Sequence, residues 1–272
     1  MTIPKVESKP CFLTPKRLQP QCPLFIYLPG MDGTGQLLRS QTAGLEAAFD
    51  VRCLAIPRSD MTNWEDITNS VLSLIQVELD RNSERSVYLC GESFGGCLAQ
   101  KVAVAAPSKF KRIILINPAS SFKLRPWYVW ASPLMNYVPE WMFDVGAIGL
   151  LPFLASLSRI TERDRTELLE TVQSVPSQTI RWRVSLLREF EIDNNKLAQL
   201  TQPTLIIASS DDRLLPSSEE GRRLANILPN SKMVTLPNSG HACLLEADIN
   251  LYEILKTNNF LDNLAAPIPS KT

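Results

Sequence analysis

The chain has 272 residues, of which 44% are hydrophobic, so it can bury the core of one large domain or two small ones. It carries 28 Lys and Arg against 28 Asp and Glu, and this formal charge of zero argues against a nucleic-acid-binding protein, which normally shows a basic excess. The single histidine, His241, excludes a multi-histidine zinc or di-iron centre. The chemistry predicted below calls for neither a metal ion nor an organic cofactor.

The cysteines and the hydropathy of the sequence indicate the cellular compartment in which we expect the protein. The six cysteines are scattered, form no C-x-x-C pair and stand partly in apolar runs, so we expect reduced thiols and a cytoplasmic protein. The first twenty residues contain four prolines and no continuous apolar stretch, which argues against a secretory signal. The longest uncharged apolar runs, Pro126–Pro139 and Val145–Ser158, have 14 residues each, whereas a spanning helix needs about 20. We expect a soluble protein, with peripheral membrane contact and the oligomeric state left open.

Short apolar runs, typical of buried strands, alternate along the chain with longer amphipathic runs, typical of helices. In the first part of the chain, this pattern predicts strands at Leu24–Leu28, Val51–Ile56, Val87–Cys90 and Ile113–Ile116. It predicts helices between them at 36–48, Trp64–Asp80 and Phe94–Ala106. In the last part of the chain, it predicts strands at Thr204–Ala208 and Lys232–Leu236, and helices at 217–227 and 243–256. Such alternation predicts an α/β fold with a mostly parallel sheet and helices on both faces.

Between about 119 and 200 the alternation stops, and the segment becomes aromatic and punctuated by prolines. Four of the five tryptophans lie in it. We interpret it as a helical cap inserted after the strand that ends near Ile116. The predicted organisation is an N-terminal extension over 1–22, a core formed by 23–118 and 201–272, and a cap over 119–200.

Gly91-Glu-Ser93-Phe-Gly95 matches the pattern G-x-S-x-G between a predicted strand and a predicted helix. This is the setting of a nucleophile elbow, in which glycines permit a strained turn that exposes the serine hydroxyl above the sheet. The start of the following helix would place positive dipole charge near that hydroxyl. The alternative is that Ser93 is an ordinary helix N-cap.

A serine nucleophile needs a base and a carboxylate that orients the base. His241 follows the last predicted strand, at the carboxyl edge of the sheet where α/β sites form, although a lone histidine is often only a surface or core residue. Asp211 and Asp212 follow the strand Thr204–Ala208, and the chain order serine, aspartate, histidine is that of α/β-hydrolases. The spacing D-x-x-x-P to Pro216 favours Asp212, with Asp211 as the alternative.

An oxyanion hole is expected in the loop Leu28-Pro-Gly-Met31-Asp-Gly-Thr-Gly35, which follows the first predicted strand. Backbone N–H groups of Met31 and Phe94 would stabilise a tetrahedral intermediate there. The glycines can also serve a tight turn that leads into a helix, and both interpretations can hold together. Asp32 and Thr34 are expected to fix this loop and not to act on the substrate. A phosphate-binding loop is disfavoured because the pattern G-x-x-x-x-G-K-[ST] is absent.

Three motifs carry a family resemblance: the loop just described, Gly-Glu-Ser-Phe-Gly-Gly-Cys-Leu-Ala (91–99) and Asn-Ser-Gly-His-Ala-Cys-Leu-Leu-Glu (238–246). Over roughly 23–258 the chain resembles the α/β-hydrolase domain of plant phytyl ester synthases and related esterase, lipase and thioesterase proteins. The resemblance implies Ser93 as nucleophile, Asp212 as acid partner and His241 as base. It also implies acyl hydrolase or acyltransferase chemistry on chloroplast lipids and isoprenoid alcohols. Those proteins continue into an acyltransferase domain with an H-x-x-x-x-D motif. Here the residue five positions after His241 is Glu246, which lies within the hydrolase motif, so we infer no acyltransferase domain.

The sequence therefore predicts a serine hydrolase that cleaves or transfers the acyl groups of lipid-like esters or thioesters through an acyl-enzyme on Ser93. Proton abstraction or C–C lyase chemistry on the same residues remains an alternative, as does a non-catalytic binding module. Trp127, Trp130 and Trp141 of the cap are predicted to line an apolar substrate pocket, unless they only pack the cap against the sheet. The predicted partner is a small lipid or acyl ester.

Overall fold

The structure is a computed structural model that describes residues 9–261. Its central sheet has seven strands in the order β1-β3-β2-β4-β5-β6-β7. Strands β2 to β7 are parallel, and β1 pairs with β3 in the antiparallel direction at one edge. The strands are β1 (Cys11–Leu13), β2 (Leu24–Leu28), β3 (Asp50–Ala55), β4 (Val87–Glu92), β5 (Arg112–Ile116), β6 (Thr204–Ser209) and β7 (Ser231–Leu236). The predicted mostly parallel sheet is confirmed.

Strand β2 shows why continuous apolar runs form this sheet. All five of its residues are buried, and alternate side chains enter different cores. Leu24, Ile26 and Leu28 join the core on one face, whereas Phe25 and Tyr27 join the core on the other. A parallel strand covered on both faces needs apolar residues at every position, so it lacks the polar alternation of a half-exposed strand.

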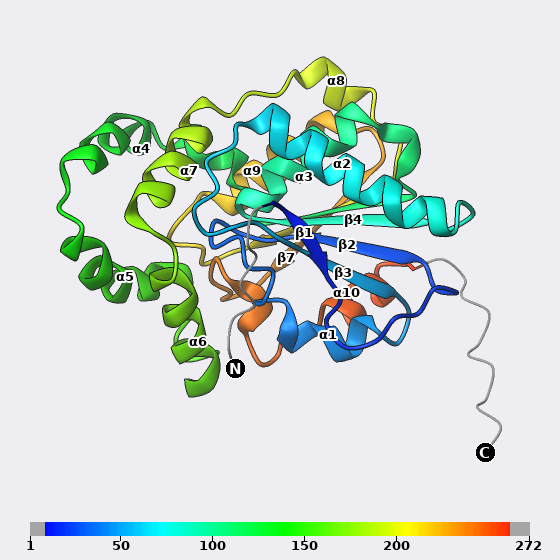
Figure 1. The fold of residues 1–272 in the computed structure, drawn as a ribbon, viewed down its shortest axis with the longest axis horizontal. Helices are drawn as coiled ribbons and strands as arrows, with labels where there is room; N and C mark the ends of the chain where they lie inside the picture. Colours follow the sequence, from blue (N-terminus) through cyan, green and yellow to red (C-terminus); the bar gives the residue numbers. More distant parts are fainter. Residues whose placement is uncertain (1–8, 262–272) are drawn as a thin grey trace.

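Helices cover both faces of the sheet (Figure 1). One layer consists of α2 (Trp64–Arg81), α3 (Phe94–Ala105), α8 (Asn194–Ala198) and α9 (Ser217–Ile227), and the other of α1 (Arg39–Leu45) and α10 (Leu251–Thr257). The long helix α2 begins at an N-cap, because the side chain of Asn63 accepts a hydrogen bond from the backbone N–H of Asp66. Its buried face packs on the core that also contains α3.

The chain changes direction across the sheet at β2. From β2 it passes to β3 on one side, and then returns to β4 on the other side. At such a switch point the loops that leave the carboxyl ends of the two central strands diverge and leave room for a ligand. The loops after β2 and β4 carry the two glycine-containing motifs of the sequence.

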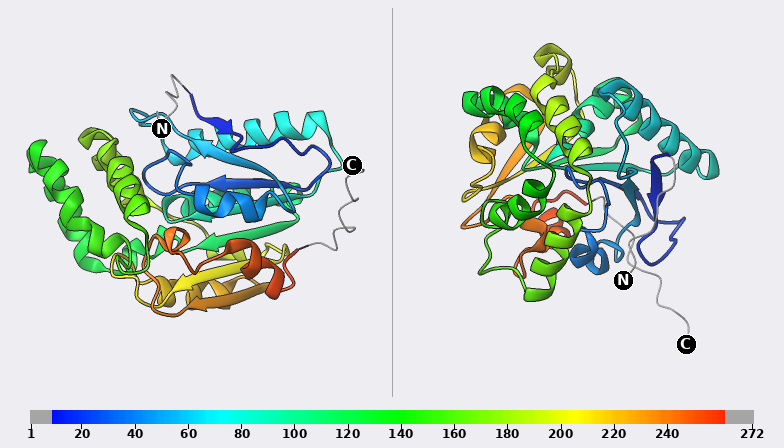
Figure 2. Two further views of the ribbon diagram at one scale, coloured as in Figure 1. Left: turned by 90° about the horizontal axis from the view of Figure 1, so that it is seen from below. Right: turned by 60° about the vertical axis from the view of Figure 1, so that its left-hand side comes forward.

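The segment 119–200 is helical, as expected, and it stands beyond the carboxyl ends of the parallel strands (Figure 2). Its first part contains η2 (Ala119–Leu124), α4 (Pro126–Ala131) and η3 (Ser132–Tyr137). Its second part contains α5 (Trp141–Leu154), α6 (Glu162–Gln173) and α7 (Ser177–Glu189), followed by α8. The cap therefore lies over the edge of the sheet where the switch point is found. No helix among residues 9–261 has the length and hydropathy required to cross a membrane.

The structure differs from the expected elements in three places. Cys11–Leu13 lies in the expected N-terminal extension but forms edge strand β1, which is too short to be recognised from its composition. The expected helix over 36–48 is only Arg39–Leu45.

The expected helix over 243–256 is divided into η4 (Cys243–Leu245) and α10. The buried side chain of Gln41 explains the break. Its amide nitrogen donates to the carbonyl oxygens of Leu244 and Ile249, and its oxygen accepts from the N–H of Leu251. These contacts satisfy backbone groups that a continuous helix would have paired internally.

Candidate active site

Ser93 stands between β4 and α3 in a strained conformation, with φ +54° and ψ −116°. Its N–H donates to the carbonyl oxygen of Ile116, and its own carbonyl accepts from Ala119, so neighbouring segments hold the turn on both sides. A Cβ atom at Gly91 would lie 2.2 Å from the carbonyl oxygen of Gly95, so a side chain cannot be accommodated there. The local structure is the sharp strand–turn–helix that the sequence motif predicts.

Gly95→Ala is expected to destabilise the fold by several kcal/mol, because the new Cβ would lie 2.0 Å from the carbonyl oxygen of Leu28. Thermal unfolding monitored by circular dichroism measures the effect. Gly146→Ala in α5 is the matched control, because nothing lies within 4 Å of its Cβ position. That control should leave stability unchanged or raise it by about 0.5–1 kcal/mol. A melting temperature equal to that of the wild type in Gly95→Ala would contradict the close packing of the elbow.

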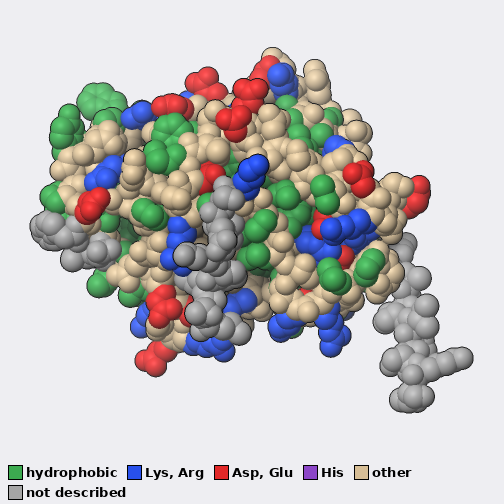
Figure 3. Space-filling view, viewed as in Figure 1, with side chains coloured by type: hydrophobic (Ala, Val, Ile, Leu, Met, Phe, Trp, Pro, Cys, Tyr) green, Lys and Arg blue, Asp and Glu red, His purple; other side chains and the backbone are tan. Residues whose placement is uncertain are grey.

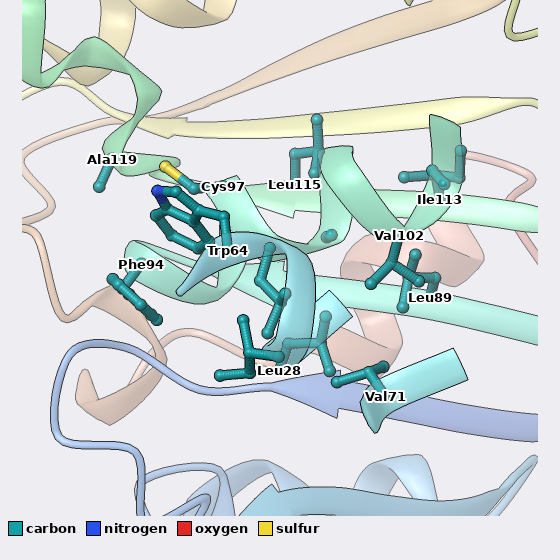
Figure 4. Packing of buried hydrophobic residues seen from close by; sticks show 14 of the residues in the cluster. Leu28, Trp64, Val71, Leu89, Phe94, Cys97, Val102, Ile113, Leu115 and Ala119 are labelled. Atoms are coloured by element: carbon teal, nitrogen blue, oxygen red, sulfur yellow. The ribbon is translucent and has the colours of Figure 1, made fainter. Parts of the chain in front are cut away.

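Aromatic packing fixes the start of α3 beneath the elbow (Figure 4). The indole of Trp64 stacks on the ring of Phe94, with ring centroids 4.7 Å apart. The indole N–H of Trp64 donates to the carbonyl oxygen of Leu186 at 2.9 Å, which ties α2 to α7 of the cap. The residue that follows Ser93 is therefore buried and cannot shift freely.

Three side chains from distant parts of the chain meet at the elbow. The Nε2 atom of His241 lies 2.8 Å from the Oγ atom of Ser93, and its Nδ1 atom lies 2.7 Å from Oδ2 of Asp212. Asp212 follows β6, and its other oxygen accepts from the N–H groups of Leu214 and Leu215 at 2.9 Å each. The structure thus brings together the three residues that the sequence singled out.

Asp211, the alternative acid, takes a different position. It is exposed, its N–H donates to the carbonyl oxygen of Ser239, and its carboxylate accepts from the hydroxyl of Ser210. The Asp212 side chain is only 1% exposed and is hydrogen-bonded to the imidazole. The geometry favours Asp212 as the partner of His241.

Asn117, which none of the sequence motifs indicated, positions the histidine loop. Its amide nitrogen donates to the carbonyl oxygen of His241 at 2.8 Å and to Oγ of Ser209 at 2.9 Å, while its oxygen accepts from the N–H of Ser209. It is fully buried and adopts φ +42°, a conformation that asparagine tolerates better than most residues. The only sequence signal was an asparagine directly after a predicted strand and before Pro118.

Glu246 connects the histidine loop to the cap. Its carboxylate accepts from the N–H of Gly240 at 2.7 Å, and its other oxygen lies 2.9 Å from Nε of Arg159. The guanidinium of Arg159 also donates to the carbonyl oxygen of Pro237 and pairs with Asp248. Glu246, which stood out in the sequence only for its spacing from His241, therefore fixes the backbone next to the histidine.

The loop after β2 lies against the nucleophile. A Cβ atom at Gly30 would be 3.7 Å from that of Ser93. The neighbouring Met31 is fixed through its carbonyl oxygen, which accepts from Arg183 at 2.6 Å, and Asp32 accepts from the N–H and hydroxyl of Thr34. These contacts agree with the expected loop-fixing role of Asp32 and Thr34.

Phe94 is the first residue of α3, so its N–H has no acceptor within its own helix. Two backbone N–H groups, those of Met31 and Phe94, are thus carried by elements that flank the hydroxyl of Ser93. We propose that these two N–H groups form the oxyanion hole.

A comparison with known protein families shows to which family the chain belongs. The family model of the serine aminopeptidases, S33, matches residues 56–248. The chain belongs to this family of α/β-hydrolases. A fold comparison agrees, since an α/β-hydrolase from a Medee basin deep-sea metagenome library superimposes with a TM-score of 0.75 at 18% identity, covering 95% of this chain and 97% of the other.

Curated relatives support the resemblance seen in the motifs. Phytyl ester synthase 1 of Arabidopsis thaliana, described as chloroplastic, is 32% identical over 257 residues, which is 86% of this hydrolase and 36% of the relative. Phytyl ester synthase 2 of the same plant is 30% identical over 268 residues, or 88% and 38% of the two chains. The hydrolase therefore spans little more than a third of the length of either relative.

The charges around His241 favour its protonated form. Burial opposes protonation, but Asp212 and Glu92 outweigh it, so the pKa of His241 lies above its ordinary value of 6.5. For Asp212, burial opposes ionisation, but the attraction of His241 and several hydrogen bonds outweigh it and lower the pKa of the carboxyl. The hydrolase thus holds an ionised carboxylate beside an imidazole that readily accepts a proton.

Glu92, directly before the nucleophile, is a further titratable group of the site, and its sequence motif does not indicate its role. It is 7% exposed and accepts a hydrogen bond from the hydroxyl of Tyr27 on β2. Burial raises the pKa of Glu92 to about 7, and the hydrogen bond from Tyr27 and the attraction of His241 act in the opposite direction. Burial thus favours the neutral carboxyl of Glu92 next to the nucleophile.

The pH dependence of hydrolysis should depend on both His241 and Glu92. The histidine must be neutral to accept a proton, so kcat/KM, which reports the free enzyme, should rise with pH, with a midpoint above the ordinary 6.5. Glu92→Gln removes a negative charge that favours imidazolium, so the pKa of His241 falls and the midpoint moves to lower pH. Profiles of kcat/KM against pH measure this shift. Glu84→Gln, at an exposed site, is the control, and equal profiles for the two variants would refute the coupling.

The three tryptophans of the cap were predicted to line an apolar substrate pocket. Trp127 is 59% exposed and Trp130 is 84% exposed, so the prediction that they line an apolar pocket is wrong for these two side chains in this structure. Trp141 begins α5, but its side chain is outside the described part of the chain. Residues three apart share a helix face, and Tyr128 and Val129 of the same helix pack inward instead. Composition alone could not tell which face turns inward.

The expectation that no metal or organic cofactor is needed remains a prediction. Within residues 9–261, no group of three or more His, Cys, Asp or Glu side chains is arranged to hold a metal ion.

Proposed function

We propose that this α/β-hydrolase cleaves carboxylic esters with lipid-like acyl chains through a covalent acyl-enzyme on Ser93. The observation that carries the proposal is the continuous hydrogen-bonded row of Asp212, His241 and Ser93, with distances of 2.7 and 2.8 Å. An ordinary N-cap serine would bond to the backbone N–H of its own helix, but the side chain of Ser93 makes no such cap bond.

In the first half-reaction, Nε2 of His241 takes the proton of the Ser93 hydroxyl as Oγ forms a bond to the carbonyl carbon of the ester. The negative charge on the former carbonyl oxygen would be stabilised by the N–H groups of Met31 and Phe94. When the intermediate collapses, the carbon–oxygen bond to the alcohol breaks, and the proton on His241 passes to the departing alkoxide. The acyl group is then esterified to Ser93.

In the second half-reaction, His241 takes a proton from water as the water oxygen attacks the acyl carbon. Collapse returns the proton to Oγ of Ser93 and releases the carboxylic acid. Asp212 holds the Nδ1–H tautomer throughout and stabilises the imidazolium. An alcohol in place of water would give acyl transfer by the same steps, as the name of the phytyl ester synthases suggests for those relatives.

The preference for lipid-like chains is supported by the cap. Phe122 and Tyr128 stack with their ring centroids 5.2 Å apart, and the hydroxyl of Tyr128 donates to the carbonyl oxygen of Leu214, two residues from Asp212. Apolar cap residues therefore stand beside the candidate catalytic residues. Each methylene that becomes buried contributes about 0.8 kcal/mol, or roughly a fourfold gain in binding.

The proposal predicts two results that can be obtained on one preparation. A fluorophosphonate probe should label Ser93, as identified by peptide mass spectrometry, and kcat/KM for p-nitrophenyl esters should rise from short to medium or long acyl chains below micelle formation. Labelling that is equal in Ser93→Ala, or no ester cleavage at any chain length, would favour the proton-abstraction or lyase alternative. A profile that is flat or falls with chain length would remove the lipid preference alone.

A further inference from the structure

Arg183, on helix α7 of the cap, is a buried cation that contacts backbone carbonyl groups. Figure 3 shows Lys and Arg side chains on the surface of the molecule, where they ordinarily lie, whereas Arg183 is only 2% exposed. Its guanidinium donates to the carbonyl oxygen of Met31 at 2.6 Å and to that of Pro57 at 3.3 Å. Removing a charge from water is costly, so the contacts that hold this guanidinium indicate what it does.

The loop after β2 contains a tight turn that Arg183 holds at two points. The N–H of Gly33 donates to the carbonyl oxygen of Gly30 at 3.0 Å, which closes the turn around Met31 and Asp32. The first point of contact is the carbonyl oxygen of Met31, in the middle of the turn. The second is Gly33, which has φ +70° and where a Cβ atom would lie 2.9 Å from Nη1 of Arg183. The guanidinium therefore occupies space that only glycine leaves open at this position.

The turn sets the direction of the N–H group of Met31. This N–H shares one planar trans peptide unit with the carbonyl group of Gly30, so the two groups point in opposite directions. Because the Gly30 carbonyl points into the turn toward Gly33, the N–H of Met31 points out of it. Gly30 itself lies beside the nucleophile, with its Cβ position 3.7 Å from the Cβ of Ser93. The direction of this N–H thus depends on the turn, and the turn is held by Arg183.

Helix α7 also holds the second candidate donor of the oxyanion hole. The carbonyl oxygen of Leu186 accepts from the indole N–H of Trp64 at 2.9 Å, and this indole stacks on Phe94. Arg183 and Leu186 stand three positions apart, on one side of the helix. The same side of α7 therefore contacts the loop that contains Met31 and the aromatic pair that contains Phe94.

We propose that Arg183 is a positioning residue of the oxyanion hole, which holds the turn from Gly30 to Gly33 so that the N–H of Met31 can donate to the oxyanion of the tetrahedral intermediate. This inference rests on the proposed ester hydrolysis and adds a residue of the cap to it. The negative charge develops only in the intermediate and in the transition states that flank it. A misdirected N–H therefore weakens the stabilisation of those states and leaves substrate binding unchanged, so that loss of Arg183 should lower kcat without raising KM.

Arg183→Met tests the proposal, because methionine keeps an apolar side chain at this position and removes every donor. With a short-chain p-nitrophenyl ester, kcat should fall about 10- to 100-fold, less than the roughly 10²–10³-fold cost of deleting an oxyanion-hole donor outright, and KM should stay within about twofold. The affinity for a trifluoromethyl ketone, whose hemiketal oxyanion on Ser93 needs the hole, should fall by the same factor as kcat. The affinity for the corresponding ether, which has no carbonyl oxygen, should not change.

Arg181 provides a matched control on the same helix. Its guanidinium also donates to two backbone carbonyl oxygens, those of Met135 at 2.9 Å and Val138 at 2.7 Å, but both belong to the cap. Arg181→Met should therefore lower the melting temperature, as Arg183→Met does, and leave kcat and the ketone affinity within about twofold of the wild type. Arg183→Lys keeps a cation that can donate to the Met31 carbonyl but lacks the planar fork, so its kcat should lie between those of Arg183→Met and the wild type.

Equal losses of kcat in Arg181→Met and Arg183→Met would overturn the proposal, because weakened packing of the cap would then explain both. A folded Arg183→Met that keeps the wild-type kcat and ketone affinity, or that raises KM alone, would overturn it as well. If circular dichroism shows that Arg183→Met is unfolded, Arg183→Lys carries the same comparison with Arg181→Met. A wild-type protein that neither cleaves the ester nor binds the ketone would overturn the proposed function and this inference with it, whereas an active wild type with unaffected Arg183 variants would overturn the inference alone.

Discussion

Replacing Ser93 with alanine is expected to lower kcat for ester hydrolysis by about 10⁴-fold or more. The variant lacks the oxygen that forms the acyl-enzyme, while the backbone turn and its hydrogen bonds to Ile116 and Ala119 remain. Because alanine keeps the Cβ atom, the melting temperature should stay close to that of the wild type. Steady-state kinetics on a chromogenic ester and circular dichroism on the same samples measure both quantities.

Ser73→Ala is a suitable control, since Ser73 is an exposed serine of α2 whose hydroxyl donates only to the carbonyl oxygen of Asn69 in its own helix. It should retain full activity. If folded Ser93→Ala kept more than about a tenth of the wild-type kcat, an acyl-enzyme on Ser93 would be ruled out.

Asp212→Asn should reduce kcat by about 10³–10⁴-fold without unfolding the protein. The amide oxygen of asparagine can still accept from the N–H groups of Leu214 and Leu215, which preserves the turn. It no longer offers a negative charge to Nδ1 of His241, so the correct tautomer and the imidazolium lose their stabilisation. The pKa of the histidine should also fall, since Asp212 is the principal group that raises it.

The adjacent Asp211 provides a control that changes the same chemical group one residue away. Asp211→Asn should lose less than about threefold in kcat, because its exposed carboxylate contacts Ser210 and not the imidazole. A larger loss in Asp211→Asn than in Asp212→Asn would reverse the assignment of the acid. Kinetics of the two variants at one pH, together with their pH profiles, decide between the residues.

Several features of the site were readable from short stretches of sequence. The elbow could be recognised because its constraints are local: Gly91 and Gly95 stand where a Cβ atom would collide with backbone less than 2.5 Å away. The choice of Asp212 over Asp211 followed from a spacing, and the structure favours the same residue. The glycine loop after β2 was likewise expected beside the nucleophile, where it is found.

Other residues of the site carry no local signal. Asn117 acts by connecting His241 to Ser209, and the three residues lie on separate segments that only the sheet brings together. Glu92 is recognisable as an unusual group only once its burial and its contact with Tyr27, 65 positions earlier, are known. In each case the function of the side chain comes from neighbours that are far away along the chain.

The sequence by itself determined the α/β class, the order of the parallel strands along the chain, the nucleophile motif and the cap insertion. These follow from periodicity and from glycine requirements, which act over a few residues. Only the tertiary structure decided that the hydroxyl of Ser93 meets an imidazole 148 positions away, and that Trp127 and Trp130 turn outward. The physical reason is that hydrophobicity favours burial of an aromatic ring somewhere, whereas the face that is buried depends on which surface the rest of the chain supplies.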